Sequence, residues 1–76
     1  MTVTWEQDGE RTWRAIGYLG RRATVSRSYS QWRERDVYEA EIRYLDGPTI
    51  RGPHGYVTKA AALRWAERKL TEGAPS

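Results

Sequence analysis

The stretch VYEAEIRYL, residues 37–45, decides the fold, because apolar and charged side chains alternate from Tyr38 to Tyr44. A period of two places the two sets on opposite faces of a β-strand. One face would carry Tyr38, Ala40, Ile42 and Tyr44, and the other would carry Glu39, Glu41 and Arg43. Asp46-Gly47-Pro48 then forces a turn, since Pro lacks an amide hydrogen and Gly permits positive φ. The stretch predicts a half-buried antiparallel strand.

Two segments rich in aromatic and β-branched residues precede this strand, at 12–19 and 22–30, and they flank Gly20-Arg21. A Gly-X pair between two such runs is typical of a two-residue hairpin turn. With that loop, Ile16 lies opposite Val25, and Arg14 lies opposite Arg27. Extending the meander through 31–36 places Val25 opposite Ile42. The predicted core face is Ile16, Tyr18, Ala23, Val25, Tyr29, Tyr38, Ala40, Ile42 and Tyr44.

The C-terminal part of the chain predicts a helix from Lys59 to Leu70, with Thr58 as its N-cap. An apolar stripe along this helix should cover the apolar sheet face. The stripe consists of Ala62, Leu63, Ala66 and Leu70. Residues 1–10 are interpreted as an arm or a weak first strand, Thr49–Arg51 as a brief edge strand and 71–76 as a frayed tail.

The predicted fold class is therefore α+β, a three- or four-stranded antiparallel meander with one C-terminal helix packed on one face. We expect Ile42 and Leu63 at the centre of the core. A chain of 76 residues should form a single small domain spanning 1–76. Mean hydropathy is −0.88, and no apolar run approaches the roughly 20 residues of a membrane span. With no signal peptide evident, the expected location is cytoplasmic.

Charge changes sign along the chain. The net charge of +3 is divided among four blocks, which carry −3 over 1–10, +6 over 11–35, −3 over 36–46 and +3 over 47–76. A protein built mainly to bind phosphates would be expected to carry a more uniformly basic face. The bipolar pattern instead favours a partner whose surface carries both signs.

Nothing in the composition points to catalysis, and we expect no enzyme and no cofactor. The chain has no Cys, which excludes disulfides and thiolate metal sites, and no metal site is expected. Its one His, His54, lies between Pro53 and Gly55 and is expected to be an exposed loop residue. Glu39 and Glu41 share a strand face, as paired catalytic carboxylates might, but on an open sheet face they would be solvated, and we expect no catalytic role for them.

Two tryptophans are candidate protein contacts. The predicted register places Trp13 on the face away from the helix, where it is either a contact anchor or is covered by the N-terminal arm through Trp5. Trp32 lies at a hairpin tip among two arginines and two acids, a combination enriched at protein interfaces. The candidate protein-binding residues are Trp13, Trp32, Arg33, Arg35, Glu39 and Glu41.

Basic residues of the first hairpin form the alternative site. Arg14, Arg21, Arg22 and Arg27 are either exposed solubilising residues or phosphate contacts. Used together they would make a sequence-tolerant DNA- or RNA-binding module.

The segment GYVTKAAALRWAE, residues 55–67, following three predicted strands, resembles small phage and mobile-element proteins. The outline is similar to the arm-type DNA-binding domain of tyrosine integrases, which implies three strands entering a groove with one helix behind them. Glu39 and Glu41 depart from that pattern, because they occupy the face that would meet phosphates. The Ala-rich helix is similar to the last helix of double-stranded RNA-binding domains, but their first helix has no counterpart here.

A small chain with a bipolar surface also resembles, in type, phage-encoded inhibitors of host defence such as anti-CRISPR proteins. This resemblance implies a host protein or nucleoprotein partner, for example a CRISPR effector. Our expectation is a non-enzymatic inhibitor that occludes a surface of such a complex, as a monomer or weak homodimer that does not bind membranes. The alternative is direct nucleic-acid binding.

Overall fold

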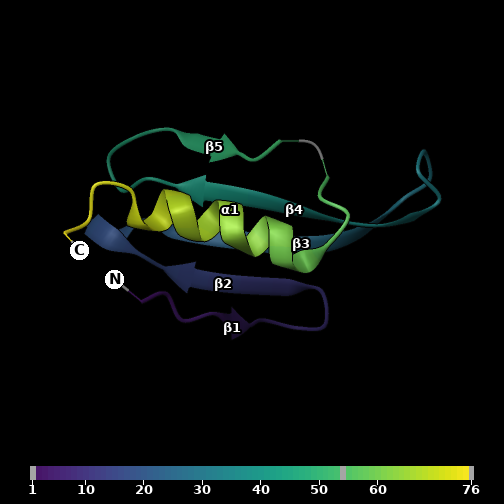
Figure 1. The fold of residues 1–76 in the computed structure, drawn as a ribbon, viewed down its shortest axis with the longest axis horizontal. Helices are drawn as coiled ribbons and strands as arrows, with labels where there is room; N and C mark the ends of the chain where they lie inside the picture. Colours follow the sequence, from purple (N-terminus) through teal and green to yellow (C-terminus); the bar gives the residue numbers. More distant parts are fainter. Residues whose placement is uncertain (1, 54, 76) are drawn as a thin grey trace.

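The computed structural model describes residues 2–53 and 55–75, and the expectation about His54 lies outside the described residues. Figure 1 shows an antiparallel sheet with strand order β1-β2-β3-β4-β5 and a helix, α1, across one of its faces. The bounds are β1 Glu6–Gln7, β2 Thr12–Ile16, β3 Arg22–Ser30, β4 Arg35–Arg43, β5 Thr49–Arg51 and α1 Lys59–Thr71. The predicted α+β meander with its C-terminal helix is confirmed.

The predicted strand number of three or four was wrong, because two short edge strands bring the sheet to five. In β1, Glu6 pairs with Arg14, and in β5, Ile50 pairs with Ile42. Strands of two or three residues carry almost no alternation in sequence, so their pairing depends on neighbours. The arm that contains β1 is joined to α1 by a hydrogen bond from Trp5 Nε1 to Glu67 Oε1 of 2.8 Å.

The register between β2 and β3 differs from the two-residue turn that the sequence predicts. Ala15 lies opposite Ala23, and Ile16 lies opposite Arg22, so the connecting loop runs from 17 to 21. Compared with the predicted pairing of Ile16 with Val25, the register moves by three residues. An odd shift exchanges the two faces of β2. Ala15 is therefore buried, whereas Ile16 is 64% exposed.

Two glycines explain this longer loop. Gly17 packs so tightly against α1 that a Cβ on it would lie 2.5 Å from the Leu70 Cβ. Leu19 and Gly20 then take left-handed conformations, with φ of 58° and 74°. Gly17 packs against the helix, so β2 ends at Ile16, three residues before the end of the predicted segment, and residues 17–21 form the turn.

The register between β3 and β4 differs from the predicted one by two residues, and each side chain stays on its predicted face of the sheet. Ala23 pairs with Ile42 and Val25 with Ala40, instead of Val25 with Ile42. An even shift leaves the same side chains on the same face. Arg14 lies opposite Thr24 rather than Arg27, so the predicted Arg14–Arg27 pair was wrong. The directly opposed arginines are Arg22 and Arg43.

The core lies between α1 and the strands β2, β3 and β4. Val25, Ile42 and Leu70 are its largest fully buried side chains, which confirms Ile42 as central. Leu63 is only partly buried and packs at its margin. The other core residues are Ala15, Ala23, Ala40, Ala62 and Ala66. Tyr29 was predicted on the core face but is 58% exposed, because its end of the β3–β4 hairpin extends past α1 (Figure 1).

Side chains form hydrogen bonds with the backbone groups at both ends of the helix. Thr58 is the predicted N-cap, and its Oγ1 accepts a hydrogen bond from the Ala61 amide. At the other end, Arg21 Nη1 donates to the carbonyl oxygens of Lys69 and Glu72, at 3.0 and 2.6 Å. Within the described part of the chain, no helix is long and apolar enough to cross a membrane.

Candidate functional site

The tip of the β3–β4 hairpin presents the most exposed large apolar side chain among the described residues. Trp32 is 94% exposed, and Figure 1 shows the turn that contains it projecting away from the helix-covered part of the sheet. Both strands of this hairpin are nine residues long, whereas α1 packs only on the part of them nearer to the other end. The hairpin therefore holds an indole well away from the core.

Hydrogen bonds from Arg33 order this tip. Its backbone amide donates to Ser30 Oγ at 3.2 Å, which closes the turn, and its Nη1 donates to the Gly55 carbonyl at 2.9 Å. Gly55 packs closely against Val37: a Cβ added at Gly55 would lie 3.1 Å from the Val37 Cβ. The Arg33 guanidinium is thus engaged within the protein, and the turn is tied to the loop before α1. Of the predicted contact residues at this tip, Trp32 and Arg35 are both exposed, and Trp32 is the apolar one.

The sheet face away from α1 is polar, and we call it the open face. Strand alternation places Arg35, Glu39 and Glu41 on it, the first two exposed and Glu41 half-buried. Arg14 and Arg22 also lie there, and so do Arg43 and Arg51. The pairings give one row across all five strands, Glu6–Arg14–Thr24–Glu41–Arg51. Charges of opposite sign are therefore interleaved on this face.

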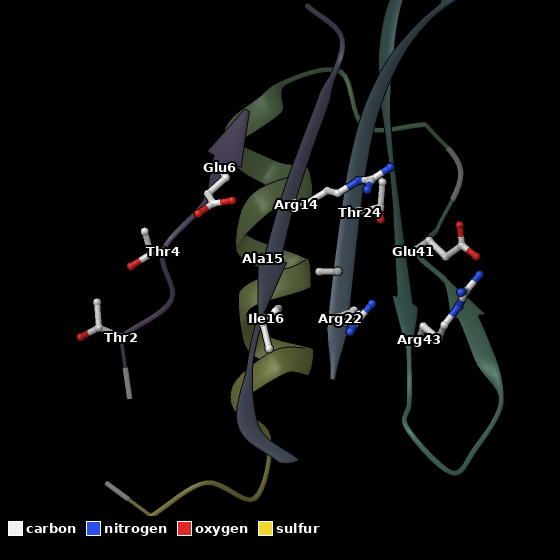
Figure 2. A pocket seen from close by; sticks show the side chains of 11 residues that line it. Thr2, Thr4, Glu6, Arg14, Ala15, Ile16, Arg22, Thr24, Glu41 and Arg43 are labelled. Atoms are coloured by element: carbon white, nitrogen blue, oxygen red, sulfur yellow. The ribbon is translucent and has the colours of Figure 1, made fainter. Parts of the chain in front are cut away.

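A shallow hollow of about 670 Å³ lies on the open face between the N-terminal arm and the central strands (Figure 2). Its charged lining comes from Glu6, Arg14, Arg22, Glu41 and Arg43. Arg14 is paired there with Asp8, with 3.1 Å between its Nε and the carboxylate Oδ2. Both side chains of that pair are more than half exposed, so the ion pair contributes little to stability.

Trp13 is the first correction among the candidate site residues, since it lies on the face that α1 covers. Its ring centroid is 6.2 Å from that of Tyr38, and Lys59 Nζ lies 4.9 Å from its centroid. The three-residue register change reverses the predicted orientation. The predicted place of Trp13 on the face away from the helix was wrong, and Trp13 packs at the margin of the core with Tyr38 and Lys59 beside it.

The four arginines of the predicted nucleic-acid site do not form one surface. Arg21 bonds to the end of α1, and its Cζ lies 5.7 and 5.3 Å from the ring centroids of Tyr18 and Tyr44. Arg27 lies opposite Tyr38 on the helix side of β3 and is half-buried. Only Arg14 and Arg22 lie on the open face.

Several exposed residues were missed by sequence reasoning. Arg43 and Arg51 join Arg14 and Arg22 on the open face, and the alternation of residues 37–45 already placed Arg43 there. Three exposed apolar side chains gather at the end of the sheet opposite to Trp32: Ile16, Leu19 and Leu45. Sequence offered no sign of the exposure of Leu19, because it follows from a left-handed backbone conformation.

Among residues 2–53 and 55–75 no group of three or more His, Cys, Asp or Glu side chains could hold a metal ion. No protein-family model, no curated protein and no solved structure matches the chain.

Proposed function

We propose that this protein is a non-enzymatic binding protein of the phage-inhibitor type, which occludes a surface of a nucleic-acid-handling complex such as a CRISPR effector. The observation that carries the proposal is Trp32, a tryptophan 94% exposed at the tip of a projecting hairpin. Tryptophan is the residue most enriched among side chains that dominate binding energy at protein interfaces. We place its action in the cytoplasm, where such complexes work.

The tip of the β3–β4 hairpin would be a preorganised binding element. A Trp side chain buries roughly 150–250 Å² of surface when it is covered, which is a large gain for one residue. The hydrogen bonds of Arg33 to Ser30 and Gly55 hold the turn before any partner arrives. Ordering costs on binding are then reduced, because the loop does not have to be fixed at that moment.

The charges around the tip indicate the charge character of the partner surface. Glu34, Arg35 and Asp36 are all exposed beside Trp32, and Glu39 follows on the open face. A surface with interleaved acids and bases attracts a uniformly charged polymer less than a basic surface does, and it complements a protein surface of mixed sign. The arrangement therefore supports a protein surface as the contact, flanking the place where the complex holds its nucleic acid.

The test is inhibition of purified CRISPR effector complexes, assembled with guide RNA and assayed for cleavage of target DNA. We expect one effector type to be inhibited, and Trp32→Ala to weaken inhibition by at least about 10-fold without changing the circular dichroism spectrum. Leu45→Ala is the matched control, since Leu45 is 71% exposed at the other end of the sheet. Equal potency of Trp32→Ala and the wild type would contradict the role of the tip. Failure to bind or inhibit any effector type would contradict the partner class.

A second candidate function is nucleic-acid binding through the open face. It is favoured by four arginines from four adjacent strands, Arg14, Arg22, Arg43 and Arg51, on one face. A mobility-shift titration with duplex DNA at two salt concentrations tests it, because each phosphate contact adds a counterion term to the salt dependence. Binding that falls steeply with salt and is lost in Arg14→Ala with Arg51→Ala would support this function. Binding indifferent to these substitutions would exclude it.

A further inference from the structure

Arg22 and Arg43 lie directly opposite each other on the two central strands. Both side chains are exposed, and the nine paired positions of β3 and β4 fix their relative positions. Directly opposed residues in an antiparallel pair have Cβ atoms about 5 Å apart, and two like charges at that spacing are destabilising. The central pairing of the sheet thus contains a repulsive pair that the fold does not need.

Carboxylates of the described residues do not neutralise this pair. Neither guanidinium lies within 4.0 Å of a described carboxylate oxygen, whereas Arg14 has Asp8 at 3.1 Å. The flanking positions in the same cross-strand row are Ile16 on β2 and Thr49 on β5, both uncharged. Glu41 lies in the next row, opposite Thr24, and no ion pair joins it to either arginine.

The surroundings of the pair are those of an anion site. Both arginines line the hollow of the open face (Figure 2), and so do Thr24 and Glu41 of the next cross-strand row. Guanidinium groups match the oxygens of phosphate with two parallel hydrogen bonds, and a threonine hydroxyl adds a further donor. Glu6 and Glu41 border the site and limit the negative charge it accepts. The hollow therefore suits one phosphate group rather than a continuous run of phosphates.

We propose that Arg22 and Arg43 together bind a single phosphate group, with Thr24 beside them. The site is separate from the hairpin tip that carries Trp32, and it does not rest on the proposed inhibitor function. If the phosphate belongs to a nucleic-acid backbone, the site is one of the contacts through which the open face would bind nucleic acid. The same chemistry serves a free phosphate or a phosphomonoester.

Thermal melting in increasing inorganic phosphate, with sodium chloride added to constant ionic strength, tests the site. A ligand that binds only the folded state raises the melting temperature, and we expect a saturable rise of about 4 to 8 °C in the wild type. Arg22→Gln and Arg43→Gln should each abolish the rise. Arg68→Gln is the matched control, because Arg68 is exposed on α1, away from the open face, and it should respond as the wild type does.

Arg43→Glu provides an independent readout. It places opposite charges across the β3–β4 pair, so it should melt above the wild type without phosphate and show no response to phosphate. Lower melting of Arg43→Glu without phosphate would contradict the repulsive pair. An identical phosphate response in all variants, or no response in the wild type to either ligand, would overturn the site.

A parallel titration with a short DNA duplex identifies the source of the phosphate. A response to both ligands, lost in Arg43→Gln, supports the site with free phosphate as a sufficient ligand. A response to the duplex alone, lost in Arg43→Gln, supports it with a backbone phosphodiester as the ligand. Arg51→Ala, on the open face but outside the lining of the hollow, should weaken only the duplex response, which separates failure of the second candidate function from failure of the site. Trp32→Ala should leave both responses unchanged.

Discussion

Trp5 Nε1 donates a hydrogen bond of 2.8 Å to Glu67 Oε1, which joins the N-terminal arm to the middle of α1 across 62 residues of sequence. Both side chains are partly buried, and Trp5 also packs against the core. The bond therefore closes the sheet on its β1 side, where the strand itself has only two residues.

Replacing Trp5 by Phe should destabilise the protein by about 1 kcal/mol, because it removes a hydrogen bond to a charged group while keeping most of the apolar contact. Urea unfolding followed by circular dichroism measures the change. Glu67→Gln keeps an acceptor oxygen and should cost less. Glu67→Ala removes the acceptor, so combining it with Trp5→Phe should cost less than the sum of those two, and strict additivity would show that the bond contributes nothing.

Gly17→Ala should destabilise the fold by about 2 to 3 kcal/mol. The added methyl group would lie 2.5 Å from the Leu70 Cβ and 2.7 Å from the Leu70 carbonyl oxygen, so helix and strand would have to separate. Gly47→Ala is the comparison, since its Cβ would lie 3.2 Å from the Tyr44 Cβ in an exposed turn and should cost much less. An unchanged melting temperature for Gly17→Ala would show that the end of α1 can move away from Gly17 without loss of stability.

Ile42→Ala should cost roughly 2 to 4 kcal/mol, because Ile42 is fully buried beneath α1. In a domain of this size that loss should remove most of the cooperative melting transition. Leu63→Ala should cost less, since Leu63 is only partly buried. The reverse order of the two variants in urea would contradict the position of the core.

Arg21→Ala should destabilise the protein by about 2 kcal/mol, through loss of hydrogen bonds to the carbonyls of Lys69 in α1 and of the C-cap Glu72, and of contacts with two tyrosine rings. Hydrogen exchange of the amides in the last turn of α1 should accelerate more than that of Ala62. Arg21→Lys should recover only part of the stability, because an ammonium group lacks the planar fork. Unchanged exchange at the helix end would refute the capping role.

Leu19→Gly should stabilise the protein by about 0.5 to 1 kcal/mol. Leu19 has φ 58° and ψ 29°, a left-handed conformation that costs a non-glycine residue roughly 1–2 kcal/mol. Its side chain is 65% exposed, so little packing is lost, although glycine gains entropy in the unfolded state. Destabilisation by more than 1 kcal/mol in urea would indicate that the side chain packs within the loop.

The candidate site was predictable in part. Trp32 could be placed at an exposed tip, because a polar loop between two long strands projects from any hairpin. Trp13 could not be placed, since its face depends on a register that the residues of β2 do not specify. The sequence left Arg21 as either a solubilising residue or a phosphate contact, whereas its hydrogen bonds to the end of α1 join positions 48 and 51 residues away.

By itself, the sequence determined the strand within 37–45, the turn after it, and a helix capped by Thr58, because alternation, turn chemistry and capping act over a few residues. Tertiary structure alone decided the register of β2 and the number of strands. The close contact of Gly17 with Leu70 and the left-handed Leu19 lengthen the β2–β3 loop by three residues. An odd change in register exchanges the faces of a strand, so that contact between distant residues determined which side chains lie in the core and which face solvent.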